Sequence, residues 1–226
     1  MKGRTANAAV VLTAAGSSRR MGLKTKKEFL KINGNFILQL SLHPFVLSNI
    51  FSQYIIVLPE AVIEIGKDIL SSLEISSSFT YVTGGTTRQE SVYNGLLALE
   101  KFSPEIVLIH DGARPWVSES IIEKVYRTTA LKDAAIPVIP STNAMKSINA
   151  SGTVVADLER KYTVAAQTPQ GFCFNKILTA HKKARHDHLD YVDDAAIYGK
   201  YIGSVETVTG DISNKKITYI SDLQED

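Results

Sequence analysis

Apolar runs and amphipathic stretches alternate along most of the chain. Five mostly apolar runs predict strands, and all but the run at 79–82 lack polar alternation, which is typical of strands buried on both faces. They span residues 8–12, 54–58, 79–82, 106–109 and 134–139. Between them, apolar residues recur at helical spacing, as Val62, Ile65 and Ile69 do. This alternation predicts one α/β domain, residues 1–226, with a parallel sheet covered by helices on both sides.

Several segments give more specific signals. The apolar stretch 36–47 predicts a mostly buried helix that Pro44 interrupts or bends. Residues 166–172 indicate an irregular polar turn, and short strands at 205–208 and 217–220 are predicted to end the sheet. The helix that follows 79–82 is predicted to turn four apolar side chains inward: Val92, Leu96, Leu97 and Leu99.

The alternation breaks between Thr142 and Ala165. Residues 145–148 and 153–156 predict two short strands, and the Asn-Ala-Ser-Gly sequence between them is a hairpin signal. The segment lacks a strong core pattern. It is therefore either an arm that projects to another subunit or a surface excursion of one chain.

Charge and cysteine content exclude several classes of protein. Lys and Arg number 25 against 23 Asp and Glu, a formal net charge of +2, which argues against a general nucleic-acid-binding surface. The single cysteine, Cys173, excludes an internal disulfide and a cysteine-based zinc site. No run approaches the roughly 20 apolar residues that a membrane span needs, and the sequence before the first strand leaves no room for a signal peptide. We therefore expect a cytoplasmic protein without nucleic-acid or membrane partners.

Small and charged residues follow three predicted strands, in the turns 14–20, 83–88 and 110–114. All three turns lie at the carboxyl ends of strands, where open α/β sheets bind ligands. The small residues of the first turn permit close backbone approach. They are followed by cations that can neutralise a polyanion: Arg19, Arg20, Lys24, Lys26 and Lys27. This order predicts a triphosphate cradle. Because the Walker and dinucleotide patterns are both missing, an ordinary turn with a solvated basic face is the alternative.

Six motifs in register carry a family resemblance. They are AAGSSRRMG followed by KKEF, then TGGTTRQES, HDGARP, AAQTPQGF, VDDA and NKKIT. In this order they closely resemble the nucleotide-sugar-type cytidylyltransferases, and among these the 2-C-methyl-D-erythritol 4-phosphate cytidylyltransferases of the non-mevalonate isoprenoid pathway. The resemblance implies a Rossmann-like three-layer α/β fold, with a mostly parallel twisted sheet and a projecting β-hairpin arm. It also implies CMP transfer from CTP to a polyol phosphate, release of pyrophosphate, and a homodimer formed through the arm of residues 142–165.

The resemblance also implies roles for individual residues. The expected catalytic residues are Arg20, Lys27 and Lys216. Nucleotide contacts are expected from Ala14, Ala15, Gly16, Gly85, Arg88 and Ser91. Acceptor contacts are expected from Asp111, Arg114 and, on the arm, Arg160. The implied cofactor is Mg²⁺ held mainly through the CTP phosphates, so we expect no set of protein metal ligands.

Each of these residues also has a plainer interpretation. Lys216 could be a solvated strand-edge lysine, Asp111 and Arg114 a local pair, and Arg160 a solvated arginine. His110 is expected to be a satisfied strand-end histidine. The paired carboxylates Asp193 and Asp194 resemble an acid/base site, but their place before a helix favours capping. The family register favours the functional interpretation for the other residues.

Departures from the family pattern cluster around the acceptor site. Lys26 stands where the family usually has Pro, Asn143-Ala144 replaces an Asp-Thr pair, and Val164 replaces Trp. The acceptor is therefore less secure than the nucleotide. Two alternatives stay open: a ribitol 5-phosphate cytidylyltransferase, which shares most of the motifs, and a nucleotide-binding homologue that has lost turnover.

Overall fold

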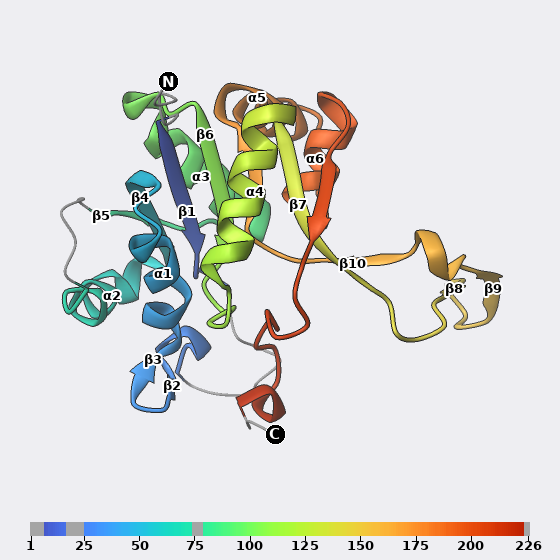
Figure 1. The fold of residues 1–226 in the computed structure, drawn as a ribbon, viewed down its shortest axis with the longest axis horizontal. Coiled ribbons are helices and arrows are strands. Elements are labelled where there is room, and N and C mark those ends of the chain that lie inside the picture. Colours follow the sequence, from blue (N-terminus) through green and yellow to red (C-terminus); the bar gives the residue numbers. More distant parts are fainter. Residues whose placement is uncertain (1–6, 17–24, 74–78, 224–226) are drawn as a thin grey trace.

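A mixed eight-stranded sheet forms the centre of the protein (Figure 1). The structure is a computed structural model, and it describes residues 7–16, 25–73 and 79–223. The strands in spatial order are β10 (Val164–Ala166), β7 (Ala134–Pro140), β11 (Gln170–Cys173), β6 (Ile106–Asp111), β1 (Ala8–Thr13), β4 (Phe51–Leu58) and β5 (Phe79–Thr83). The eighth strand, β12 (Glu206–Thr209), pairs with β7.

Most neighbouring strands are parallel, as predicted. The strand β1 is parallel to both β4 and β6, β4 to β5, and β12 to β7. The antiparallel strands are β10, at the end of the arm, and β11, which follows it in the chain. The predicted irregular turn at 166–172 is therefore partly wrong, because Gln170, Gly171 and Phe172 are buried in β11. A four-residue strand that begins Gln-Gly has no apolar run to reveal it.

Helices cover both faces of the sheet, which confirms the three-layer prediction. They are α1 (Ile37–Leu47), α2 (Ile63–Leu70), α3 (Arg88–Leu99), α4 (Glu119–Lys132), α5 (Phe174–His186) and α6 (Asp194–Tyr201). On one face, Val10 and Leu12 of β1 belong to the same core as α1, α2 and α4. On the other, Val11 packs with α3, α5 and α6. Successive strand residues point to opposite faces, so each strand contributes to both cores.

Two details of the predicted elements are wrong. Leu97 is 36% exposed, because it lies about 100° around the helix from Leu96, which is fully buried. Residues 217–220 form no strand; the buried Ile217 instead donates its N–H to Ala113 O at 2.8 Å. In addition, Pro44 does not interrupt α1, which continues to Leu47.

Short elements complete the fold. Two hairpins lie outside the central sheet: β2 (Lys31–Ile32) with β3 (Asn35–Phe36), and β8 (Lys146–Ile148) with β9 (Val154–Asp157). Single 3₁₀ turns span Lys27–Phe29, Glu60–Val62, Glu100–Phe102, Arg160–Tyr162 and Ile220–Leu223. The β8–β9 hairpin projects from the body, to the right in Figure 1, as the arm prediction requires. None of the helices in the described ranges is long and apolar enough to cross a membrane.

Candidate active site

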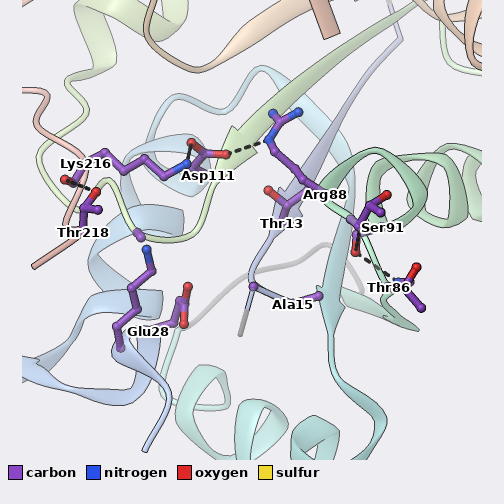
Figure 2. A pocket seen from close by; sticks show the side chains of 14 residues that line it. Thr13, Ala15, Glu28, Thr86, Arg88, Ser91, Asp111, Lys216 and Thr218 are labelled. Atoms are coloured by element: carbon purple, nitrogen blue, oxygen red, sulfur yellow. Dashed lines mark hydrogen bonds and ion pairs between the residues drawn. The ribbon is translucent and has the colours of Figure 1, made fainter. Parts of the chain in front are cut away.

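A cavity of about 550 Å³ opens where β1, β5 and β6 end. Its volume lies within the range of small-molecule sites, roughly 300–1,000 Å³. The lining residues come from the ends of these strands, the first turn of α3, the 3₁₀ turn at Lys27–Phe29 and the segment before Tyr219. Figure 2 shows their side chains converging on one space. This is the strand edge at which the polar turns were predicted to meet.

Two backbone turns form one wall of the cavity. Ala14 N–H donates to Val57 O, and Gly84 N–H donates to Leu58 O, both at 2.8 Å. The turns approach so closely that a Cβ on Gly84 would lie 2.3 Å from the Ala15 Cβ. A glycine is therefore required at position 84 because a second backbone passes beside it.

The α3 N-terminus holds the second turn in place. Thr87 caps the helix, since its hydroxyl accepts from Glu90 N–H at 3.0 Å. The Ser91 hydroxyl accepts from Gly85 N–H at 3.0 Å, and Glu90 accepts from Thr86 N–H at 2.8 Å. Ser91 therefore supports the turn from behind, in addition to lining the cavity.

Two adjacent lysines bind backbone carbonyls, and of the two Lys27 lines the cavity. Lys26 Nζ donates to Ala15 O at 3.1 Å and also to Gly16 O. Lys27 Nζ donates to Ile217 O at 2.8 Å. Lys26 thus ties the end of β1 to the start of the 3₁₀ turn.

Asp111 is the centre of the charged side chains in the cavity. Lys216 Nζ lies 2.7 Å from one carboxylate oxygen, and Arg88 Nε lies 3.3 Å from the other. Arg114 Nε is 3.7 Å away, while another nitrogen of its guanidinium donates to Asn214 O at 2.7 Å. Burial alone would raise the pKa of Asp111, but these cations outweigh it and hold the pKa well below its usual range. Asp111 is therefore ionised at neutral pH and fixes Lys216 from one side and Arg88 from the other (Figure 2).

Glu28 is the second carboxyl group of the cavity. Its side chain is buried, and its Oε2 has no hydrogen-bond partner in the described part of the chain. Burial raises the pKa of Glu28, and the nearby Lys27 and Lys26 only partly oppose this effect. A buried carboxyl oxygen without a donor is costly to folding, so Glu28 can accept a donor or a cation from a ligand.

His110 and the Asp193–Asp194 pair behave largely as predicted. The imidazole of His110 is buried between Thr168 Oγ1 at 3.0 Å and Arg114 O at 3.3 Å. Burial lowers the pKa of His110 to about 3, so it is neutral and satisfied. Asp193 caps α6 by accepting from Ala196 N–H at 2.9 Å. Asp194 is not a cap; it forms an ion pair with Arg88 at 2.9 Å.

Most predicted site residues lie together around the cavity. Those that line it are Ala15, Gly16, Lys27, Gly85, Arg88, Ser91, Asp111 and Lys216. Ala14 is buried directly behind the wall, and Arg114 lies beside Asp111 without lining the cavity. Arg160 lies on the projecting arm, where its guanidinium donates to Thr142 O at 3.2 Å. Arg20 falls outside the described residues.

Several lining residues were not predicted. Thr13, Glu28, Ala113 and Thr218 line the cavity as well. Glu28 and Thr218 lie inside the KKEF and NKKIT motifs, in which the lysines alone suggest chemistry. Thr13 is the first polar residue after the apolar run of β1, which is the available signal for it.

Comparison with known proteins places the chain in one family. Residues 8–225 match the sequence model of IspD, 2-C-methyl-D-erythritol 4-phosphate cytidylyltransferase. The enzyme of that name from Clostridium botulinum (strain ATCC 19397 / Type A) is 37% identical over 95% of this chain and 93% of its own length. A bifunctional IspD/IspF enzyme from Bradyrhizobium diazoefficiens is 38% identical over 95% of this chain. The chain spans about half the length of such bifunctional relatives, 54% in that case.

Solved structures give the same result. The 4-diphosphocytidyl-2C-methyl-D-erythritol synthase of Anaerococcus prevotii superposes with a TM-score of 0.86 at 30% identity, over 97% of this chain and 93% of that one. The 2-C-methyl-D-erythritol 4-phosphate cytidylyltransferase of Thermus thermophilus superposes with a TM-score of 0.75 at 28% identity, over 96% of this chain and 95% of that one. The chain therefore belongs to the 2-C-methyl-D-erythritol 4-phosphate cytidylyltransferase family.

Proposed function

We propose that this chain transfers CMP from CTP to 2-C-methyl-D-erythritol 4-phosphate and releases pyrophosphate, a step of isoprenoid precursor synthesis. Family membership over residues 8–225 supports the proposal. The observation that carries it is the cavity itself, where two close backbone turns meet Lys27, Lys216 and the ionised Asp111. Charged side chains such as Lys27 and Lys216 line the cavity, and ammonium groups bind phosphate oxygens. The cavity therefore suits a phosphate-rich substrate.

The reaction requires little proton chemistry from the protein. A phosphate oxygen of the acceptor attacks the α-phosphorus of CTP, a new P–O bond forms, and the bond to the β-phosphate oxygen breaks. Because a phosphomonoester is already anionic, no strong base is needed. The protein must instead bring two anions together and stabilise charge that spreads in the transition state.

Lys27 and Lys216 are the described cations that we assign to this task. Lys216 is held by Asp111, and Lys27 is held toward Ile217 O, so both ammonium groups are positioned before substrate binds. Preorganised charge avoids reorganisation during the reaction and is worth more than mobile charge. Arg20, which the family register places in the same role, completes the proposed set. The turns at Ala15–Gly16 and Gly84–Gly85 would receive the nucleotide.

Mg²⁺ is the proposed cofactor, held mainly through the CTP phosphates. Within the described ranges, no group of three or more His, Cys, Asp or Glu side chains could hold a metal by itself. Mg²⁺ is commonly bound by phosphates, water and one or two carboxylates. Glu28, with its unpartnered buried Oε2, fits as the carboxylate that contacts the ion or its water shell. When bound, Mg²⁺ would neutralise triphosphate charge and favour departure of pyrophosphate.

We infer that the acceptor site is completed by a second copy of this chain. The arm of residues 142–165 carries exposed apolar side chains: Met145, Ile148, Val154, Val155, Leu158, Tyr162 and Val164. Contiguous exposed apolar side chains mark interaction surfaces. Arg160 of the same arm would then reach the acceptor phosphate in the partner's cavity, beside Asp111 and Arg114. The reducing cytoplasm is the proposed location, which the single Cys173 supports.

A pyrophosphate-release assay tests the proposal. Purified protein is given CTP and Mg²⁺ with 2-C-methyl-D-erythritol 4-phosphate, with ribitol 5-phosphate, or with no acceptor, and the Lys216→Ala variant is the control for contaminating activity. We expect release only with the methylerythritol phosphate. Preference for ribitol 5-phosphate would replace the proposed acceptor. This acceptor is included in the assay because Ala144 lacks the hydroxyl that the family has at this position. CTP binding without pyrophosphate release under any of these conditions would refute the proposed enzymatic activity.

A further inference from the structure

Asp194 is a fully buried carboxylate that reaches the active site through one arginine. It is the first residue of α6, on the face of the sheet that α3, α5 and α6 cover. Its Oδ2 lies 2.9 Å from Arg88 Nη2, as an ion pair rather than an aligned hydrogen bond. The same guanidinium uses Nε to contact Asp111 at 3.3 Å. Arg88 thus spans two carboxylates, one in the cavity and one behind it.

The contacts continue on both sides of this arginine. Behind Asp194, its Oδ1 accepts from Nε2 of the buried His181 at 3.1 Å. In front, Asp111 binds Lys216 at 2.7 Å. A continuous chain of contacts therefore leads from His181 through Asp194, Arg88 and Asp111 to the ammonium group of Lys216. These residues come from separate segments, namely α5, α6, α3, β6 and the stretch after β12, and the fold brings them into contact.

We propose that Asp194 is a positioning residue: it holds Arg88 against Asp111, and through them it fixes where the Lys216 ammonium lies in the cavity. The inference rests on the proposed function, because Lys216 is assigned there to the transition state. Within the described chain, the ion pairs of Arg88 are with these two aspartates alone. Without Asp194, the guanidinium is free to turn toward the cavity and leave Asp111.

Capping does not account for Asp194. The neighbouring Asp193 already caps α6, since its Oδ1 accepts from Ala196 N–H at 2.9 Å. Removing one partner of a buried ion pair leaves an uncompensated charge, which is more disruptive than loss of an exposed pair. For Asp194 that charge is Arg88, which would keep only its 3.3 Å contact with Asp111, so the disturbance is passed directly to the active site.

The test compares Asp194→Asn with Asp193→Asn. The first variant keeps the size of the side chain and an oxygen for His181, but it presents an amide N–H to Arg88. We expect kcat to fall at least about tenfold, the effect of losing one contact that matters in the transition state. The dissociation constant for CTP, measured by calorimetry, is expected to change less than about threefold. Asp193→Asn makes the same chemical change one residue away and retains a good capping side chain, so its kcat is expected to stay within about twofold of the parent.

Two further measurements separate positioning from a loss of structure. The calorimetric stoichiometry gives the fraction of molecules with an intact nucleotide site, and kcat is expressed per intact site. Arg88→Lys keeps a cation that cannot span both carboxylates. We expect the kcat loss of the double variant to be smaller than the product of the two single losses, because both substitutions act through one contact chain. If Asp194→Asn does not fold, Arg88→Lys alone must still lower kcat per site.

The outcomes are distinct. An inactive parent protein would refute the proposed function and this inference with it. An active parent with an unchanged kcat in Asp194→Asn or in folded Arg88→Lys would overturn the inference and leave the proposed function intact. A double variant whose kcat loss equals the product of the two single losses would also overturn the inference. A kcat loss that is confined to the Asp194 and Arg88 variants, shared between them and absent in Asp193→Asn supports it.

Discussion

At the residue scale, each lysine of the KKEF and NKKIT motifs has a different environment. Lys216 contacts Asp111, Lys27 contacts the Ile217 carbonyl, and Lys26 contacts carbonyls at the end of β1. Lys215, next to Lys216, is exposed and does not line the cavity. Composition and spacing cannot distinguish these lysines, since the difference lies in what each Nζ meets after folding.

The first prediction concerns the two lysines assigned to the reaction. Lys27→Ala and Lys216→Ala should each lower kcat about 10²–10³-fold, because each removes charge placed where negative charge develops. Steady-state kinetics and circular dichroism check turnover and folding. Lys215→Ala is the matched control, and it should retain the parent kcat. Near-parental turnover in either folded variant would refute the role given to that lysine.

Glu28 gives a second prediction, on pH dependence. Burial raises the pKa of Glu28 above its ordinary value of 4.5. The folded protein therefore binds this proton more tightly than the unfolded chain does. The stability that Glu28 contributes is complete below about pH 4.5 and is lost as the pH rises through the folded-state pKa. Glu28→Gln cannot ionise, so it should raise Tm at neutral pH and change it little near pH 4.

The same substitution should carry a functional cost. If Glu28 contacts Mg²⁺ or its water shell, Glu28→Gln will need more Mg²⁺ for half-maximal turnover. Thermal unfolding from about pH 4 to pH 8 and a Mg²⁺ titration give the two readouts. Glu206→Gln, which changes an exposed glutamate on β12, is the control. A Tm difference between parent and Glu28→Gln that does not grow with pH would contradict the argument from burial.

At the scale of elements, the cavity depends on how closely the loops after β1 and β5 approach. Gly84 and Ala15 are adjacent there, whereas a Cβ on Gly16 would meet no atom within 4 Å. Both glycines belong to polar turns, and both lie in motifs of the family. The sequence around each glycine does not show that Gly84 permits close packing whereas Gly16 leaves space for a ligand.

A third prediction follows from this difference. Gly84→Ala should destabilise the fold by about 1–3 kcal/mol, because the new methyl group forces Ala15 and the turn apart. Gly16→Ala should leave stability nearly unchanged and raise the KM for CTP, because its methyl group would occupy the cavity. Urea denaturation and CTP kinetics on both variants make the comparison. Equal stability losses in the two variants would show that the loops can move apart freely.

At the scale of the whole molecule, the arm is the segment that we propose contacts a second copy of this chain. Its hairpin projects from the body (Figure 1). Arg160 lies on this arm, donates to Thr142 O and does not line the cavity of its own chain. A reaction that needs Arg160 must therefore use the arm of a second copy. For this reason, mixing subunits can test whether the site is shared.

The fourth prediction is complementation between inactive subunits. In the proposed dimer, Arg160→Ala alone and Lys27→Ala alone should each be nearly inactive. After subunit exchange at equal concentrations, half the dimers are hybrids and half of their sites combine both intact residues, so activity should recover to about a quarter of the parent value. Exchange is verified with differently tagged subunits. Absence of recovery despite proven exchange would refute the action of Arg160 on the partner's site.

Much of the fold was accessible from the order of the residues. Strands such as β1, β4 and β6 are largely buried on both faces, so their apolar runs are readily recognised. The turns at their carboxyl ends could be placed at one edge because parallel strands end together. Leu97 was mispredicted because it lies about 100° around the helix from the buried Leu96. Residues 217–220 and β11 were mispredicted because their environments depend on neighbours distant in sequence.

The layer architecture, the edge of the sheet that holds the site and the motifs of the family therefore follow from the amino-acid sequence alone. Which motif residues contact one another became visible only in the folded chain. The sequence favours capping for Asp194, yet this residue pairs with Arg88, and it marks Glu28 only as a neighbour of two lysines. The physical reason is that periodicity reports the burial of single elements. A charged side chain takes its function from partners that other elements bring within about 4 Å, where an opposite charge is felt most strongly.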